Sequence, residues 1–160
     1  MPELVPLAVA VGLCVMVAAF EGAVTGDGPR TWYPGLRKPR WQIPLWASIL
    51  VGLAVYVIDG FVAYRVLTAV PSPKNQVVAM TALVVVMLLN ALWNLAFFRS
   101  RSTMVGFFGI LGFLGPVLVL QVALFAHEPV AAWAHMVYTV YLVFYDVPLF
   151  YALWRMNPQS

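Results

Sequence analysis

One stretch of the chain decides its fold class. Residues 103–126 read TMVGFFGILGFLGPVLVLQVALFA and contain no charged side chain. A helix needs about 20 mostly apolar residues to cross the hydrocarbon core of a bilayer. This stretch is therefore predicted to form a membrane-spanning helix.

Further apolar segments of spanning length lie on both sides of it. They are residues 4–25, 43–68, 77–98 and 130–154. A transmembrane barrel would instead need repeated strands of about ten residues with alternating polarity, and the sequence has no such pattern. We therefore predict an all-α integral membrane protein, a bundle of five transmembrane helices that forms a single domain over residues 1–160.

The composition independently indicates that lipid is the solvent. Apolar and aromatic residues make up 63% of the 160 residues and charged residues only 9%, whereas soluble domains carry roughly 25% charged residues. This balance excludes a soluble enzyme domain and a disordered chain, and the single cysteine excludes a disulfide scaffold. The net charge of +3 comes from basic residues at the ends of apolar segments, so no nucleic-acid partner is expected.

The basic residues also predict the orientation of the chain. Two of them, Arg65 and Lys74, fall on one side of the five predicted spans. The other side carries Arg30, Arg37, Lys38, Arg40, Arg99, Arg101 and Arg155. Because Lys and Arg are enriched in cytoplasmic loops, we expect the first loop, residues 26–42, and the C-terminus to be cytoplasmic, and the N-terminus to face away.

Three carboxyl groups, Glu21, Asp59 and Asp146, fall within predicted spans. A charged side chain at the centre of a bilayer costs at least about 2.5–3.5 kcal/mol, so such residues face the protein interior or are paired. Glu21 lies near the end of its span, where it also can reach the interface. The carboxyl groups are read either as neutral hydrogen-bond donors or as carriers of protons.

The first loop holds the most distinctive motif in the chain. Residues 32–46 read WYPGLRKPRWQIPLW. This resembles the signature W-Y-x-x-L-x-K-P-x-W-x-P-P of the translocator protein family (TspO/MBR, tryptophan-rich sensory proteins and peripheral benzodiazepine receptors), with Ile43 where a proline is expected. Further matches to family patterns are Tyr56, Gly60 and Tyr64 in the second span and Asn90, Trp93, Phe97 and Phe98 in the third.

The resemblance implies a five-helix membrane protein, often a homodimer, that binds porphyrins or sterols in a pocket closed by the first loop. A flat apolar ligand needs stacking faces, an apolar slot and a few polar groups. The ligand-binding residues expected here are Tyr33, Pro44, Trp46, Gly52, Tyr56, Asn90, Trp93, Phe97, Leu142 and Asp146. At the end of the chain Leu149, Tyr151 and Arg155 match the site proposed for cholesterol in animal members.

Two departures from the family concern catalysis. Pocket tryptophans of the second and fifth helices are tied to light-dependent porphyrin breakdown in some bacterial members, and here these positions are Gly52 and approximately Leu142. We therefore assign no catalytic residue and expect binding without breakdown. No metal site is indicated, and His135 is expected to be hydrogen-bonded internally. No cofactor is required, and porphyrin or haem is expected only as a ligand.

Several alternatives stay open at this stage. The loop tryptophans are also typical of an interfacial aromatic belt. Asn90, Trp93, Asn94 and Phe97 have helical spacing and are predicted to share one face, where the asparagines either face a ligand or hold helices together. The competing function is a proton-coupled small-molecule transporter that uses the three intramembrane carboxyl groups, although inverted repeats are not visible.

Overall fold

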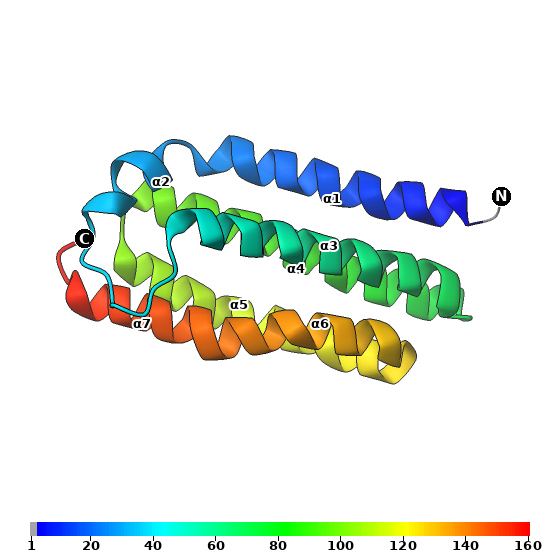
Figure 1. The fold of residues 1–160 in the computed structure, drawn as a ribbon. Coiled ribbons are helices and arrows are strands. Elements are labelled where there is room, and N and C mark those ends of the chain that lie inside the picture. Colours follow the sequence, from blue (N-terminus) through cyan, green and yellow to red (C-terminus); the bar gives the residue numbers. More distant parts are fainter. Residues whose placement is uncertain (1–2) are drawn as a thin grey trace.

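The computed structural model describes residues 3–160 and consists of long helices that lie side by side (Figure 1). Their bounds are α1 Leu4–Thr25, α3 Leu45–Ala69, α4 Pro73–Ser100, α5 Thr103–His127, and a last span made of α6 Pro129–Tyr141, the π-helical turn η2 Leu142–Asp146 and α7 Val147–Met156. Five spans are long and apolar enough to cross a membrane. The predicted five-helix fold is confirmed.

The helix bounds agree with the prediction to within two residues except at the start of α4. That helix begins at Pro73, four residues before the predicted start at residue 77. The hydroxyl of Ser72 accepts a hydrogen bond from the backbone N–H of Asn75, and Pro73 occupies a first-turn position that needs no donor. A polar first turn is thus helical because it is capped, which hydropathy alone does not reveal.

The spans form a bundle in which most helices have two or more neighbours. α1 packs against α3 and α4, and α5 packs against α4, α6 and α7. α3 packs along α6 but has at most marginal contact with η2 and α7. The core between the helices holds fully buried apolar side chains such as Val62, Leu83, Ile110, Val117 and Leu120.

The last span, predicted over residues 130–154, is present as Pro129–Met156 and contains one π-helical turn. The backbone N–H of Val147 donates to the carbonyl of Leu142, five residues back, which makes one π-helical turn. The next residue, Pro148, has no N–H to donate. π turns inserted in α-helices absorb such defects and are frequent at functional sites.

The first loop contains two short helices, α2 (Gly28–Thr31) and the 3-10 turn η1 (Tyr33–Gly35). It lies at the same end of the bundle as the C-terminus (Figure 1). Gly28 is buried against α4, where a Cβ atom would lie 2.9 Å from the Cβ of Phe98. Only glycine fits there, so this residue fixes how closely the loop approaches α4.

At the opposite end an ion pair joins α3 to the turn between α5 and α6. Arg65 donates to the carboxylate of Glu128, which also accepts from the backbone N–H of Ala131 and so caps α6. Burial by itself raises the pKa of Glu128, but the contacts with Arg65 and Ala131 outweigh it and hold the pKa below the ordinary value.

Candidate functional site

The side chain of Tyr33 anchors the first loop to the bundle. It is 7% exposed, and its ring meets the rings of Phe97 and Phe98 edge-on at centroid distances of 6.2 and 6.0 Å. Trp32 packs beside it, 5.2 Å from the ring of Phe97. Edge-to-face aromatic pairs of this kind add stabilisation beyond buried area, so α2 and η1 are held firmly on the end of α4.

The hydroxyl of Tyr33 points toward the space beneath the rest of the loop. It accepts a hydrogen bond of 2.8 Å from the side-chain amide of Gln42. Burial raises the pKa of Tyr33 to about 12, against the lowering effect of Gln42 and with further increases from Tyr145 and Asp146. The phenol is therefore neutral at ordinary pH.

The second half of the loop is tied to the last span. The backbone N–H of Ile43 donates to the hydroxyl of Tyr145 at 2.8 Å, and the ring of Trp41 meets the Tyr145 ring edge-on at 5.6 Å. Earlier in the loop, Arg37 forms two hydrogen bonds with Asn157, which follows α7. The loop therefore bridges the end of α4 and the end of α7.

One face of α3 presents Gly52, Tyr56 and Asp59 at helical spacing. A Cβ atom added at Gly52 would meet nothing within 4 Å. Two turns further along the helix, Asp59 is 4% exposed, and its Oδ1 atom finds no hydrogen-bond partner among residues 3–160. Gly52 is exposed and Asp59 is buried, so this face of α3 runs from an open position to a buried carboxyl group.

Tyr56 belongs to a polar cluster that joins three helices. Its hydroxyl donates to Glu21 of α1 at 2.6 Å. The side-chain amides of Asn90 and Asn94 on α4 donate to the two oxygens of the same carboxylate, each at 3.0 Å. The Glu21 side chain therefore does not extend to the membrane–water interface. It is paired inside the bundle, and both asparagines act as the hydrogen-bonding link between helices.

Trp93 and Phe97 point toward different helices from the two asparagines. The indole N–H of Trp93 donates to the carbonyl of Gly106 on α5 at 3.0 Å. Its ring stacks on that of Phe97 and lies 4.7 Å from the ring of Phe150 on α7. The expectation of one shared face is corrected here, because the asparagines face α1 whereas Trp93 and Phe97 face α5 and α7.

The remaining expected ligand residues are spread over the loop end of the bundle. Pro44 is exposed and precedes α3, and Trp46 in its first turn is 66% exposed and points away from the core. Leu142 is 1% exposed and packed into the core. Asp146 is half-buried at the end of η2. Asp146 directly follows Tyr145, which holds the loop at Ile43, whereas Trp46 lies on the outer surface.

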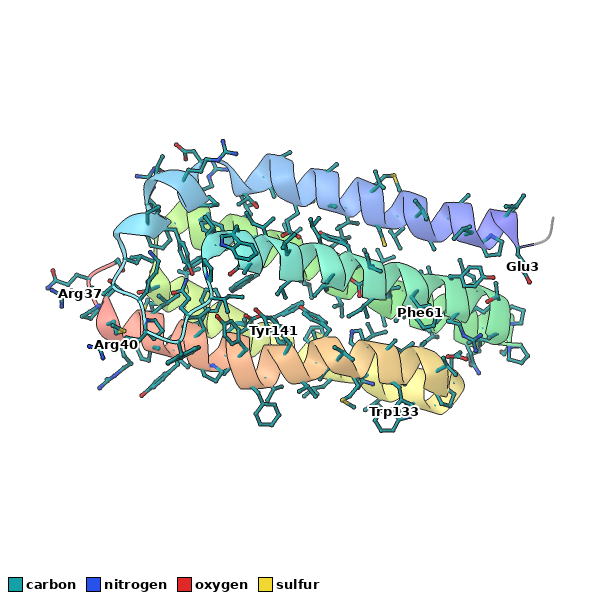
Figure 2. The ribbon with its side chains drawn as sticks, viewed as in Figure 1. Glu3, Arg37, Arg40, Phe61, Trp133 and Tyr141 are labelled. Atoms are coloured by element: carbon teal, nitrogen blue, oxygen red, sulfur yellow. The ribbon has the colours of Figure 1, made fainter. Side chains whose placement is uncertain are left out.

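The sterol-type motif at the end of the last span does not form one surface. Leu149 is 5% exposed and faces the core, whereas Tyr151 is 48% exposed and Arg155 is exposed on the outside of α7. Tyr151 packs against Phe107 of α5 with ring centroids 5.4 Å apart. In Figure 2, Arg37 and Arg40 project from this same end of the bundle, and Trp133 points outward from its flank.

A second buried polar group lies between α5 and α6. His135 is fully buried, and its Nδ1 atom lies 2.8 Å from the side-chain oxygen of Gln121. The hydroxyl of Thr139 donates to the same oxygen at 2.9 Å, while the Gln121 amide donates to the carbonyl of Ala132. The prediction that His135 is hydrogen-bonded internally is confirmed.

Comparisons with known proteins agree with the fold and the loop motif. The family model described as TspO/MBR family matches residues 10–155. The chain is also similar to a protein of Chlorobaculum tepidum named "Tryptophan-rich protein TspO", with 28% identity over 158 residues that cover 98% of each chain. Five apolar spans, the tryptophan-rich first loop and a family match over nearly the whole length establish that the chain belongs to the TspO/MBR family.

Proposed function

We propose that this membrane protein binds an apolar small molecule of the tetrapyrrole or sterol kind beneath the first loop. The site lies between the first turns of α3 and the last span, next to Gly52. The observation that carries the proposal is the unfilled position at Gly52, which is exposed, has no neighbour within 4 Å of an added Cβ atom, and lies on the helix face that also holds Tyr56. α3 has little contact with η2 and α7, so an occupant there would be enclosed by two spans and the loop.

The chemistry around this space suits a flat apolar ligand with few polar atoms. Tyr145 of η2 is half-buried and offers an aromatic surface, with its hydroxyl fixed by the backbone N–H of Ile43. Tyr33 is packed against Phe97 and Phe98 and fixes the loop. Ligand pockets of this type are mostly apolar, with a small number of placed polar groups. The loop acts as a lid, and we infer that the lid side is cytoplasmic and that the protein forms a homodimer.

The experiment is a titration of the detergent-solubilised protein with protoporphyrin and with a sterol, followed by quenching of tryptophan fluorescence. Gly52→Leu should weaken binding on the order of tenfold, because roughly 55 Å² of lost apolar contact costs about 1.4 kcal/mol. The matched control is Gly12→Leu on α1, where an added Cβ also meets nothing within 4 Å. Equal affinity in the wild-type protein and in Gly52→Leu would refute this location.

A second candidate function is proton-coupled transport, and it rests on Asp59. This carboxyl group is buried in the middle of α3, and its Oδ1 atom has no hydrogen-bond partner in the described part of the chain. Intramembrane carboxyl groups of this kind are typical of proton relays. Glu21 and Asp146 would complete the set. Uptake of protoporphyrin into proteoliposomes driven by a pH gradient, and lost in Asp59→Asn, would favour transport over simple binding.

A further inference from the structure

An apolar groove runs along the outer face of the bundle where α4 and α5 meet. One part of it has a volume of about 270 Å³, and a second part of about 350 Å³ continues it. The two parts share Leu92, Ala96 and Val105. The second part reaches Arg99 and Ser100 at the end of α4. The groove is therefore apolar along its length and cationic at one end.

The floor of the groove is fixed by the packing of α4 on α5. Trp93 lines it and is held by its hydrogen bond to the carbonyl of Gly106. At Gly109 an added Cβ would lie 2.6 Å from Cδ1 of Trp93, so the two helices cannot approach with any larger residue there. At Gly112 an added Cβ meets nothing within 4 Å. The hollow thus exists before anything binds.

The length and the exposure of the groove match one leaflet of a bilayer. Its α4 side extends from Leu89 to Arg99, which at 1.5 Å per residue is about 15 Å. This is half of a hydrocarbon core about 30 Å thick. Leu92, which lines both parts, is 46% exposed, so the groove opens to the surrounding lipid rather than to the interior of the bundle.

The charge at the end of the groove indicates which lipid fits. Arg99 is exposed and has no carboxylate within ion-pair distance among residues 3–160. The hydroxyl of the neighbouring Ser100 lies at the same end, where lipid headgroups begin. A guanidinium group matches a phosphate well, because it offers several N–H donors in one plane.

We propose that this groove is a binding site for an anionic phospholipid of the leaflet on the loop side. One acyl chain lies along Leu92, Ala96, Gly109 and Gly112, and the phosphate contacts Arg99. The site is separate from the space beneath the first loop, because residues of α4 and α5 line it, whereas that space adjoins Gly52 of α3.

The test counts lipids bound to the detergent-purified protein by native mass spectrometry. The probes are dioleoyl phosphatidylglycerol and dioleoyl phosphatidylcholine, which have the same chains and differ in net charge. We expect phosphatidylglycerol to bind about fivefold more tightly, the factor for about 1 kcal/mol from one basic residue at a membrane surface. Arg99→Gln should abolish this preference, and Gly112→Leu should weaken the binding of both lipids by filling the groove.

The controls are matched in chemistry and in place. Arg30→Gln removes an exposed arginine at the loop end but outside the groove, and Gly115→Leu adds the same side chain to α5 at another open position. Both should bind lipids like the wild-type protein. The proposal is overturned if the wild-type protein shows no preference for phosphatidylglycerol, or if Arg99→Gln retains that preference. It is also overturned if Gly112→Leu changes only the proportion of dimers, because a second copy of the chain would then cover the groove. If Gly112→Leu fails to fold, the result for Arg99→Gln still decides.

Discussion

Asn157 and Arg37, 120 residues apart in the sequence, are joined by two hydrogen bonds. The backbone N–H of Arg37 donates to Oδ1 of Asn157 at 2.9 Å, and Nδ2 of Asn157 donates to the carbonyl of Arg37 at 2.8 Å. One side-chain amide thus pairs with the loop backbone as a neighbouring strand would. Asn157 is in turn fixed by Thr103, whose hydroxyl donates to its carbonyl at 3.0 Å.

Asn157→Ala should therefore loosen the loop without unfolding the bundle. It removes two hydrogen bonds, each worth about 0.5–1.5 kcal/mol, at an exposed site. The expected result is faster hydrogen exchange at the Arg37 amide, measured by mass spectrometry, with unchanged exchange in α3 and α5. Asn157→Asp keeps the acceptor for the Arg37 N–H. Its rate of hydrogen exchange at the Arg37 amide should therefore lie between the rates of the wild-type protein and Asn157→Ala. Unchanged exchange in Asn157→Ala would show that the other loop contacts, those of Tyr33 and Tyr145, hold the loop without Asn157.

Removal of the Glu21 carboxylate should destabilise the whole bundle. Glu21→Ala removes the carboxylate that accepts from Tyr56, Asn90 and Asn94, and each hydrogen bond lost at this half-buried site costs about 1 kcal/mol. We expect a loss of about 3 kcal/mol, measured by unfolding in denaturant from mixed micelles. Glu3→Ala, at the other end of α1, is the control. A loss no larger than that of Glu3→Ala would show that the cluster adds nothing to stability.

The ion pair at the far end predicts a pH dependence. The pKa of Glu128 is lowered from its ordinary value of 4.5 in the folded protein. The ionised carboxylate therefore stabilises the fold fully above pH 4.5, and this contribution is lost as the pH falls through the lower, folded pKa. The melting temperature of Glu128→Gln should lie below that of the wild-type protein at pH 7, and the difference should shrink below pH 4.5. A difference that persists unchanged at lower pH would contradict this assignment.

Gly52 and approximately Leu142 are the positions where the family resemblance implies tryptophan in some members, and they should tolerate that residue unequally. Gly52→Trp extends into open space and should leave the melting temperature unchanged. Leu142→Trp enlarges a side chain that is 1% exposed, and overpacking of this kind costs about 1–3 kcal/mol. On illumination with protoporphyrin, Gly52→Trp should lose porphyrin absorbance faster than the wild-type protein, because an indole is restored beside the proposed site. Rapid breakdown by the unmodified protein would show that another residue performs it.

The orientation predicted from the basic residues can be tested by cysteine labelling. In a Cys14→Ala background, single cysteines at Gly35 in the loop and at Pro71 between α3 and α4 should react with a membrane-impermeant maleimide from opposite sides. A Cβ atom added at Gly35 would meet nothing within 4 Å, and Pro71 is exposed. Both positions should therefore accept a cysteine. Labelling of both from one side would contradict the five-span topology.

The spans were predictable because their lengths and apolar character alone fix them in lipid. The π turn at Leu142–Asp146 was not, because an apolar pattern over residues 130–154 fits any helical register. Pro148 was the available signal, since a proline inside a helix removes a donor and must be accommodated.

The candidate site was predictable in its residues but not in its contacts. The loop motif drew attention to Tyr33, yet its partner Gln42 and the tether at Asn157 carry no pattern by which a sequence marks them. Glu21, Asn90 and Asn94 were each recognised as polar residues in lipid. Their meeting depends on which helices are neighbours, and this follows from packing in three dimensions rather than from spacing along the chain.

The Glu21 cluster also has a consequence for how the protein is made. Glu21 leaves the ribosome 35 residues ahead of Tyr56 and 69 and 73 residues ahead of Asn90 and Asn94. Until α4 has been synthesised, the first helix carries a carboxyl group whose amide partners do not yet exist. Stable packing of α1 in the bundle therefore requires the third span, α4, to be present. The order of synthesis and the order of assembly differ, and the helix that is made first docks only after later ones have arrived.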